Sequence, residues 1–310
     1  MVPHGFRERR IRESQEKMNY QWYPGHMTKA KRMMEENCKL IDLMIELVDA
    51  RIPMSSRNPD IDVLGKNKSR LILLNKSDLA SEKANEAWMH YFEKRGVKAV
   101  KVNSKSGAGV KSIQNAVQEA CKEKIERDRK RGIINRPIRA MVVGIPNVGK
   151  STFINSFAGK ACAKTGNKPG VTKGKQWIKL NRNLELLDTP GILWPKFEDQ
   201  RVGLNLALIG SMNDQILNIE EMAYELIVFL EKEYPGLLKE KYHYSIETEE
   251  TQDLKEPLLL LNAIAISRNC LAKGGMPDLE KMSSFLLDDF RNGKLGRITL
   301  EFPEGMNDES

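Results

Sequence analysis

The sequence predicts an α/β fold for about the first two thirds of the chain, followed by a small all-α domain. Three observations support this prediction. An apolar run at 141–143 ends in the pattern G-x-x-x-x-G-K-S at 144–151, which joins a buried strand to a helix. Other short apolar runs upstream of it alternate with helical patterns, as strands and helices do in α/β proteins. Beyond Leu193 the composition becomes helical and acidic, with no further array of strands.

The pattern at 144–151 is typical of a phosphate-binding loop. Its glycines leave backbone N–H groups free to point at phosphate oxygens, and the N-terminus of the next helix adds a partial positive charge. Lys150 is expected to reach the β- and γ-phosphates, and the Ser151 hydroxyl to ligate Mg²⁺. An ordinary turn between strand and helix is the alternative, but it does not require this spacing. The residues expected to line the phosphates are Asn147, Val148, Gly149, Lys150, Ser151 and Thr152.

Two strand ends upstream predict a guanine-recognition site. The strand pattern Arg70–Leu74 opens into NKSD at 75–78, and the pattern Val97–Val102 leads into NSK at 103–105. The Asp78 carboxylate can accept hydrogen bonds from N1–H and the 2-amino group of guanine, a pair of donors that adenine lacks. The other expected contacts are Asn75 bracing the loop, the Lys76 stem along the base, Asn103 and the backbone near Ser104, and Lys105 over the other face of the base.

Further contacts to magnesium and the γ-phosphate are expected downstream. Strand patterns at 176–180 and 184–187 precede DTPG at 188–191. Asp188 is expected to hold the Mg²⁺ shell, most readily through a water ligand of the ion. The Gly191 N–H is expected to contact the γ-phosphate. KPGVT at 168–172 predicts a loop in which Thr172 is a second hydroxyl ligand. The chain is therefore expected to bind GTP and GDP with Mg²⁺.

The order of these motifs differs from that of a Ras-type GTPase, where the phosphate loop comes first and the guanine-recognition motif last. Here that motif stands upstream, and no N-K-x-D follows Asp188. We predict a circularly permuted Ras-like P-loop GTPase domain with the motif order G4-G5-G1-G2-G3, rejoined through residues 110–138. Surface loops tolerate such rearrangement. The switch at 188–191 then runs directly into the helical region, so γ-phosphate loss is expected to reorient or loosen that region.

The expected organisation has four parts. They are a disordered extension at 1–18 with Met18 as an alternative start, the permuted GTPase domain at 19–205, a helical domain at 206–300, and an acidic tail at 301–310. The pattern from Val110 to Lys130 is helical, and its end is basic. In the helical domain, helices are expected at 217–233, 256–272 and 278–292. Their spacing predicts a core of Val228, Phe229, Leu260, Leu261, Ile264, Phe285 and Leu286.

The net charge of +8 is unevenly distributed. Residues 1–216 carry 40 basic and 23 acidic side chains, whereas residues 217–310 carry 10 and 19. A basic first part favours an anionic partner, most readily nucleic acid. Seven Lys/Arg and no acidic residue occupy 159–183, and a second basic run lies at 122–131. A lysine-rich solvated surface remains the alternative.

Several classes of protein are excluded by composition. No apolar run approaches the length of a membrane span, and residues 1–17 carry charges where a secretory signal would be apolar. The four cysteines and four histidines are scattered, which predicts neither a disulfide framework nor a zinc site. We therefore expect a cytoplasmic protein that does not bind membranes.

Several long motifs resemble the ribosome biogenesis GTPase A (YlqF-type) family of circularly permuted bacterial GTPases. They are WYPGHM at 22–27, ELVDARIPMSSRNP at 46–59, LLNKSD at 73–78, GIPNVGKS at 144–151, KPGVTKGKQW at 168–177, LLDTPGILWPKFED at 186–199 and the segment 270–275. The resemblance covers about residues 19–300. It implies GTP hydrolysis coupled to late maturation of the large ribosomal subunit, with a C-terminal helical domain that contacts RNA. The acidic C-terminal part leads us to assign more of the ribosomal RNA contact to the basic GTPase domain.

Two catalytic roles complete the prediction. Ile192 follows DTPG where Ras-type enzymes carry a water-orienting glutamine, so hydrolysis is expected to be slow alone and stimulated by ribosomal particles. His26 can position water as a neutral imidazole, and the resemblance places a catalytic histidine in this motif. Its alternatives are bracing the N-terminal arm or contacting ribosomal RNA. Asn147 is expected to ligate K⁺ beside the phosphates, where positive charge assists as an arginine finger does. The alternative is that Asn147, close to the helix, only forms hydrogen bonds with backbone groups.

The sequence thus predicts a monomeric GTP-hydrolysing switch that binds the large-subunit precursor and its rRNA. Its expected catalytic residues are His26, Asn147, Lys150 and Gly191. An ATP-using P-loop enzyme is one alternative, which nucleotide competition would distinguish. A non-catalytic RNA-binding scaffold is another, and multiple turnover with ribosomal particles would exclude it.

Overall fold

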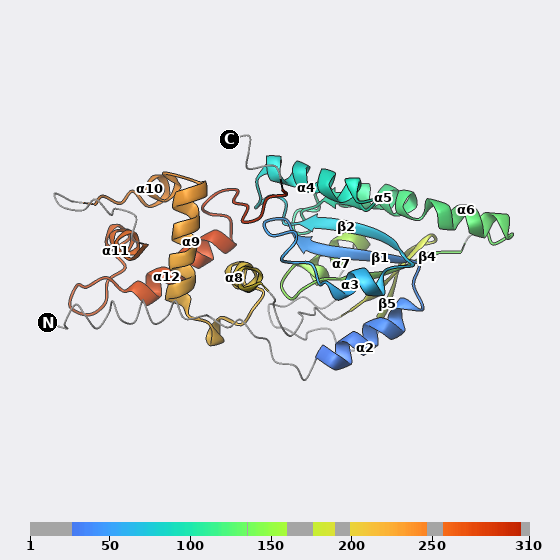
Figure 1. Ribbon diagram of the computed structural model, residues 1–310, viewed down its shortest axis with the longest axis horizontal. Helices are drawn as coiled ribbons and strands as arrows, with labels where there is room; N and C mark the ends of the chain where they lie inside the picture. Colours follow the sequence, from blue (N-terminus) through green and yellow to red (C-terminus); the bar gives the residue numbers. More distant parts are fainter. Residues whose placement is uncertain (1–26, 135, 160–175, 190–198, 247–256, 305–310) are drawn as a thin grey trace.

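The computed structural model describes residues 27–134, 136–159, 176–189, 199–246 and 257–304 (Figure 1). A six-stranded sheet in the order β3-β2-β1-β4-β6-β5 forms the larger part. Its neighbouring strands are parallel except β5 and β6, which are antiparallel. The strands are β1 (Leu43–Asp49), β2 (Ser69–Asn75), β3 (Lys98–Lys101), β4 (Ile138–Val143), β5 (Gln176–Asn181) and β6 (Leu184–Asp188).

The central strands are buried on both faces, which explains their nearly continuous apolar sequence. Every residue of β1 is buried, and β1 is paired with β2 along its whole length, from Leu43 opposite Ser69 to Asp49 opposite Asn75. The strands expected from the sequence are present, with ends displaced by at most two residues except at β4, which begins three residues before the expected run at 141–143.

Helices cover both faces of this sheet, and alternate residues of β1 separate the two faces. They are α2 (Met27–Cys38), α3 (Asp60–Leu64), α4 (Glu82–Lys94), α5 (Ile113–Ala120) and α7 (Lys150–Ala158). Leu43 and Leu47 belong to a core cluster with α5 and α7. Met44 clusters with α2 and α3, and Val48 with α4. The period of two along each strand therefore decides which helices it contacts.

The segment 110–130 is helical, as expected, but it is not one continuous helix. The segment instead forms a 3₁₀ turn η2 (Val110–Ser112), α5, and a separate helix α6 (Lys122–Lys130), with the break at Cys121. Helix α5 buries Ile113, Ala116 and Val117 against the sheet, and Cys121 is also fully buried, whereas α6 buries no residue. The break therefore lies where packing against the sheet ends, and α6 exposes Lys122, Arg127, Arg129 and Lys130 to solvent.

The C-terminal helices gather at one end of the sheet (Figure 1). They are α8 (Gln200–Leu208), η3 (Asp214–Ile216), α9 (Ile219–Glu233), α10 (Leu237–Tyr242), α11 (Pro257–Ser267) and α12 (Leu279–Arg291). Helix α9 is the centre of the group and packs against α8, α10, α11 and α12. The prediction that Val228 and Phe285 belong to the core is wrong, because these side chains are 49% and 47% exposed. Both residues lie on the outer sides of their helices, because the apolar faces of α9 and α12 are wider than the part of each helix that packs inside the bundle.

The C-terminal helices and the sheet share one continuous hydrophobic core. The chain then returns to the sheet after α12, where the Leu300 N–H donates to the Arg51 carbonyl at 2.9 Å. The Glu301 carboxylate accepts from the backbone N–H of Met54 at 2.8 Å and of Ser55 at 3.0 Å. The expected acidic tail therefore begins with a residue that is bound to the loop after β1, and the expected boundary at 205/206 falls within α8.

Within the ranges that the structure describes, no helix is both long enough and apolar enough to cross a membrane.

Candidate nucleotide-binding site

Four of the predicted motifs follow the carboxyl ends of neighbouring parallel strands. The phosphate loop follows β4, NKSD begins at the last residue of β2, NSK follows β3, and Asp188 ends β6. Because parallel strands end at the same edge of a sheet, these segments meet there, and such an edge is where open α/β sheets bind ligands. In Figure 1 the C-terminal helices lie beyond this end of the sheet.

Asn75 joins three of these segments. Its side-chain amide Nδ2 donates to the Val148 carbonyl of the phosphate loop at 2.7 Å. Its Oδ1 accepts from the backbone N–H of Ser104 at 3.0 Å and from the Ser104 hydroxyl at 2.7 Å. Both polar atoms of this buried amide are thus satisfied. The expected bracing role of Asn75 therefore has a geometric basis, since one side chain holds the phosphate loop beside the expected guanine pocket.

Gly149 is required by this close approach. Its φ of 97° lies in the left-handed region, and a Cβ at this position would stand 2.5 Å from the Asn75 amide nitrogen. Helix α7 begins at the next residue, Lys150. A larger residue would push the phosphate loop away from Asn75 and strain the backbone.

Lys150 is a buried cation at the phosphate loop, with 8% of its surface exposed. Burial lowers the pKa of Lys150 to about 8, although the nearby Asp188 carboxylate opposes this shift. Ser151 is half-buried and Thr152 is exposed in the first turn of α7. Beside Asp188, the Thr189 hydroxyl donates to the Val142 carbonyl at 2.7 Å, which ties the end of β6 to β4. A phosphate anion would supply the compensating charge that Lys150 needs.

The segments expected to recognise guanine adopt turn conformations. Lys76 has a φ of 56°, and Asp78 two residues later is exposed. Asn103 is turned inward, with its Oδ1 accepting from the backbone N–H of Lys105 at 2.9 Å and of Ser106 at 3.0 Å. Asn103 therefore shapes the loop that presents Ser104 and Lys105. The exposed Asp78 carboxylate is free to meet a base.

Asn147 bonds to a backbone group, as in the alternative considered for it, but the sequence did not predict which one. Its φ is 58°, and its Nδ2 donates to the carbonyl of Gly210, just after α8, at 2.8 Å. The Ser211 hydroxyl donates to the neighbouring Pro146 carbonyl at 3.0 Å. The phosphate loop therefore touches the C-terminal helical part directly. No local pattern at 210–211 signals this contact, because it depends on how the two parts pack.

Some predicted residues lie outside the described ranges. They are His26, Thr172 and Gly191, together with all members of the basic run at 159–183 except Lys179 and Arg182. The expected role of His26 is tested by an experiment below, and the roles of the other residues stay predictions.

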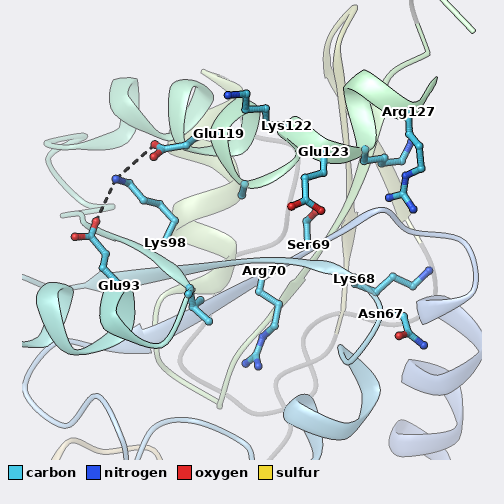
Figure 2. A pocket seen from close by; sticks show the side chains of 14 residues that line it. Asn67, Lys68, Ser69, Arg70, Glu93, Lys98, Glu119, Lys122, Glu123 and Arg127 are labelled. Carbon is cyan, nitrogen blue, oxygen red and sulfur yellow. Dashed lines mark ion pairs between the residues drawn. The ribbon is translucent and has the colours of Figure 1, made fainter. Parts of the chain in front are cut away.

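A hollow of about 800 Å³ lies at the other end of the strands (Figure 2). It is lined by the residues that begin β2 and β3 and by α5 and α6. Lys98 is held there between Glu93 at 3.1 Å and Glu119 at 3.4 Å. None of the predicted nucleotide-binding residues lines it. This hollow is therefore not the nucleotide site, although it is large.

Comparisons with known proteins agree with this geometry. A family model described as a 50S ribosome-binding GTPase matches residues 139–263. The chain is 50% identical over 292 residues to the ribosome biogenesis GTPase A of Bacillus cereus, covering 94% of this chain and 97% of that protein. It is 31% identical to the ribosome biogenesis GTPase A of Thermotoga maritima, covering 91% and 94%.

Two solved structures share the fold. A GDP-bound structure of YlqF has a TM-score of 0.64 and 26% identity, and it covers 88% of this chain and 100% of that one. A GNP-bound YlqF from T. maritima has a TM-score of 0.61 and 27% identity, with coverage of 89% and 99%. The family assignment rests on similarity at 50% identity over nearly the full length of the chain. It agrees with the phosphate loop and with the Asn75 bridge. This chain is a GTPase of the ribosome biogenesis GTPase A family.

Proposed function

We propose that this protein is a nucleotide-dependent switch that binds the precursor of the large ribosomal subunit and promotes its late assembly as a cytoplasmic monomer. The observation that carries the proposal is the Asn75 bridge, which holds a phosphate loop and a guanine-recognition loop together. The family model and the curated relatives, whose names describe 50S binding and ribosome biogenesis, support the choice of partner.

We also infer that the GTPase domain is circularly permuted. Strands β1 to β3, with NKSD and NSK, precede the phosphate-loop strand β4 in the chain, yet β1 and β4 are neighbours in the sheet. Moving β1 to β3 behind β6 gives the Ras-type order, with the phosphate loop first and guanine recognition last. In the permuted order, the segment after Asp188 leads directly into the C-terminal helices.

The side-chain oxygen atoms at the phosphate loop suit Mg²⁺, a hard cation that prefers oxygen ligands. Ser151 in the first turn of α7 and the buried Asp188 carboxylate lie at adjacent strand ends. Thr172 is proposed as the second hydroxyl ligand. The cation would neutralise charge on the phosphates, while Lys150 binds them, Gly191 contacts the γ-phosphate and Asn147 ligates K⁺.

Helix α6 carries part of the proposed RNA surface within the described residues. It buries no residue and carries basic side chains in its last turn, at Arg127, Arg129 and Lys130. Contact with RNA phosphates would make binding fall with rising salt, by about 0.7–0.9 in log affinity per log salt for each phosphate contacted.

Co-sedimentation with purified large subunits tests the proposal. The protein should sediment with the subunits in a GTP analogue and much less in GDP. Charge reversal on α6, Arg129→Glu with Lys130→Glu, should reduce sedimentation. Lys232→Glu on α9 is the matched control, because this lysine is 79% exposed but lies in the acidic part of the chain. Sedimentation that is equal in both nucleotides and insensitive to α6 would contradict the proposal.

A further inference from the structure

The end of β1 and the loop after it carry a buried ion pair that the nucleotide motifs do not include. Asp49 and Arg51 are 0% and 1% exposed. The Asp49 Oδ1 accepts from the Arg51 Nε at 2.9 Å, and Oδ2 from the Arg51 Nη2 at 2.8 Å. Burying two charges is costly, and such pairs are often no more stable than apolar replacements. Packing alone therefore gives no reason for this pair.

The same carboxylate reaches the guanine-recognition loop. Lys76 of NKSD places its Nζ 3.0 Å from the Asp49 Oδ2. Burial alone would raise the pKa of Asp49, but the Arg51 guanidinium and the Lys76 ammonium outweigh it and hold this pKa below its usual range. Asp49 is therefore ionised at all physiological pH values. Its charge fixes the end of the side chain whose stem is expected to lie along the base.

The other partner of Asp49 reaches the C-terminal helices. The Arg51 guanidinium lies 5.2 Å from the centre of the Phe290 ring in α12, and its Nη1 donates to the Arg291 carbonyl at 3.4 Å. The Arg51 carbonyl accepts from the Leu300 N–H at 2.9 Å. A continuous series of contacts thus runs from Lys76 through Asp49 and Arg51 to the end of α12 and the returning segment 298–301.

We propose that Asp49 is a positioning residue for guanine recognition, and that its ion pair with Arg51 couples the base pocket to the C-terminal helices. A free lysine side chain has several rotamers, and ordering it on binding costs conformational entropy. Asp49 orders Lys76 before the base arrives, which raises affinity. Coupling is reciprocal, so guanine binding also stabilises the position of α12 and of residues 298–301.

The inference rests on NKSD as the guanine-recognition motif, which an Asp78 variant tests separately (Discussion). Asp49→Asn keeps the shape of the side chain but removes its charge. We expect it to weaken GDP binding about tenfold, as for the loss of a charge-assisted hydrogen bond. Glu46→Gln is the matched control, since Glu46 is also a buried carboxylate of β1 paired with arginines but does not contact Lys76. It should leave GDP affinity unchanged. Displacement of a fluorescent GDP analogue measures both.

A double variant distinguishes positioning from a general structural role. If Asp49 acts through Lys76, then Asp49→Asn should add little to the loss caused by Lys76→Met. Additive losses, or a parent-like affinity in Asp49→Asn, would overturn the proposal.

Hydrogen exchange tests the coupling in the parent protein and does not depend on the folding of the Asp49 variant. GDP should slow exchange of the Leu300 amide and of the Ile298 amide, which donates to the Leu79 carbonyl at 2.9 Å. The effect should disappear in Lys76→Met at saturating GDP. Exchange at these two amides that does not respond to GDP would overturn the coupling.

Discussion

The Asn147 side-chain amide donates a 2.8 Å hydrogen bond to the Gly210 carbonyl, and this contact joins the phosphate loop to the segment after α8. Because Nδ2 is the donor, Oδ1 is the atom of this side chain that can ligate a cation. A cation held by Oδ1 would polarise the amide and strengthen its bond to Gly210. Binding of the cation beside the phosphates and packing of the C-terminal helices against the phosphate loop would then favour each other.

The first prediction concerns monovalent cations. GTP hydrolysis should be severalfold faster in KCl than in NaCl at the same ionic strength, because a cation at Asn147 adds positive charge where negative charge develops. Asn147→Ala should remove the difference between the two salts while retaining GTP binding. Equal rates of phosphate release in both salts for the parent protein would exclude a cation role for Asn147.

The second prediction concerns the base. Asp78→Asn should lose affinity for GTP and gain affinity for xanthosine triphosphate, because the carboxylate acceptor becomes an amide donor that matches the O2 carbonyl of xanthine. The loss for GTP should be about 1–3 kcal/mol. Competition binding with both nucleotides measures the switch, and the parent protein should show the opposite preference. Should the variant bind GTP as tightly as the parent, NKSD is not the guanine-recognition motif.

The third prediction concerns pH. The free protein holds Lys150 with a pKa of about 8, because burial lowers it. A bound phosphate favours the ammonium and raises this pKa, so nucleotide binding takes up a proton above pH 8. The affinity for GDP should therefore be flat below pH 8 and fall above it, by up to about tenfold per pH unit. Calorimetry in buffers of different ionisation enthalpy measures the uptake, and an affinity that stays constant to pH 9 would contradict it.

The fourth prediction concerns His26, which lies outside the described residues. His26→Ala should keep GTP affinity and subunit binding but lose most of the turnover that large subunits stimulate, because Ile192 cannot position water. Single-turnover assays with and without subunits separate the two effects. Turnover that survives the substitution would assign the activating group to the ribosome.

The fifth prediction concerns the returning segment. Glu301→Ala should destabilise the fold by about 1–3 kcal/mol, because the Met54 and Ser55 amides lose their acceptor. Glu304→Ala is the control, since this glutamate is three residues away and exposed. Urea denaturation compares the two variants. Equal midpoints would mean that water replaces Glu301 without cost.

Local sequence patterns predicted the strands and motif loops well, since a period of two and a glycine-rich turn are properties of a few neighbouring residues. Asn75 could be expected to brace its loop, although its partner Val148 lies 73 residues away. The contacts of Asp49 with Lys76 and of Arg51 with Arg291 could not be expected, because they depend on the packing of distant segments. The break at Cys121 was missed for a related reason, as helical propensity continues through it and only the end of the sheet interrupts the helix.

The bond between Ser55 and Glu301 has a consequence for how the protein is made. Its partners are 246 residues apart, so in a chain emerging from the ribosome the loop after β1 cannot be closed until residue 301 has been made. At about 5–20 residues per second this delay lasts on the order of ten seconds or more. A nascent chain released before residue 301 would have all six strands, but its loop after β1 would lack the Glu301 acceptor. Proteases that recognise exposed loops could then remove an unfinished copy before it competes for its partner.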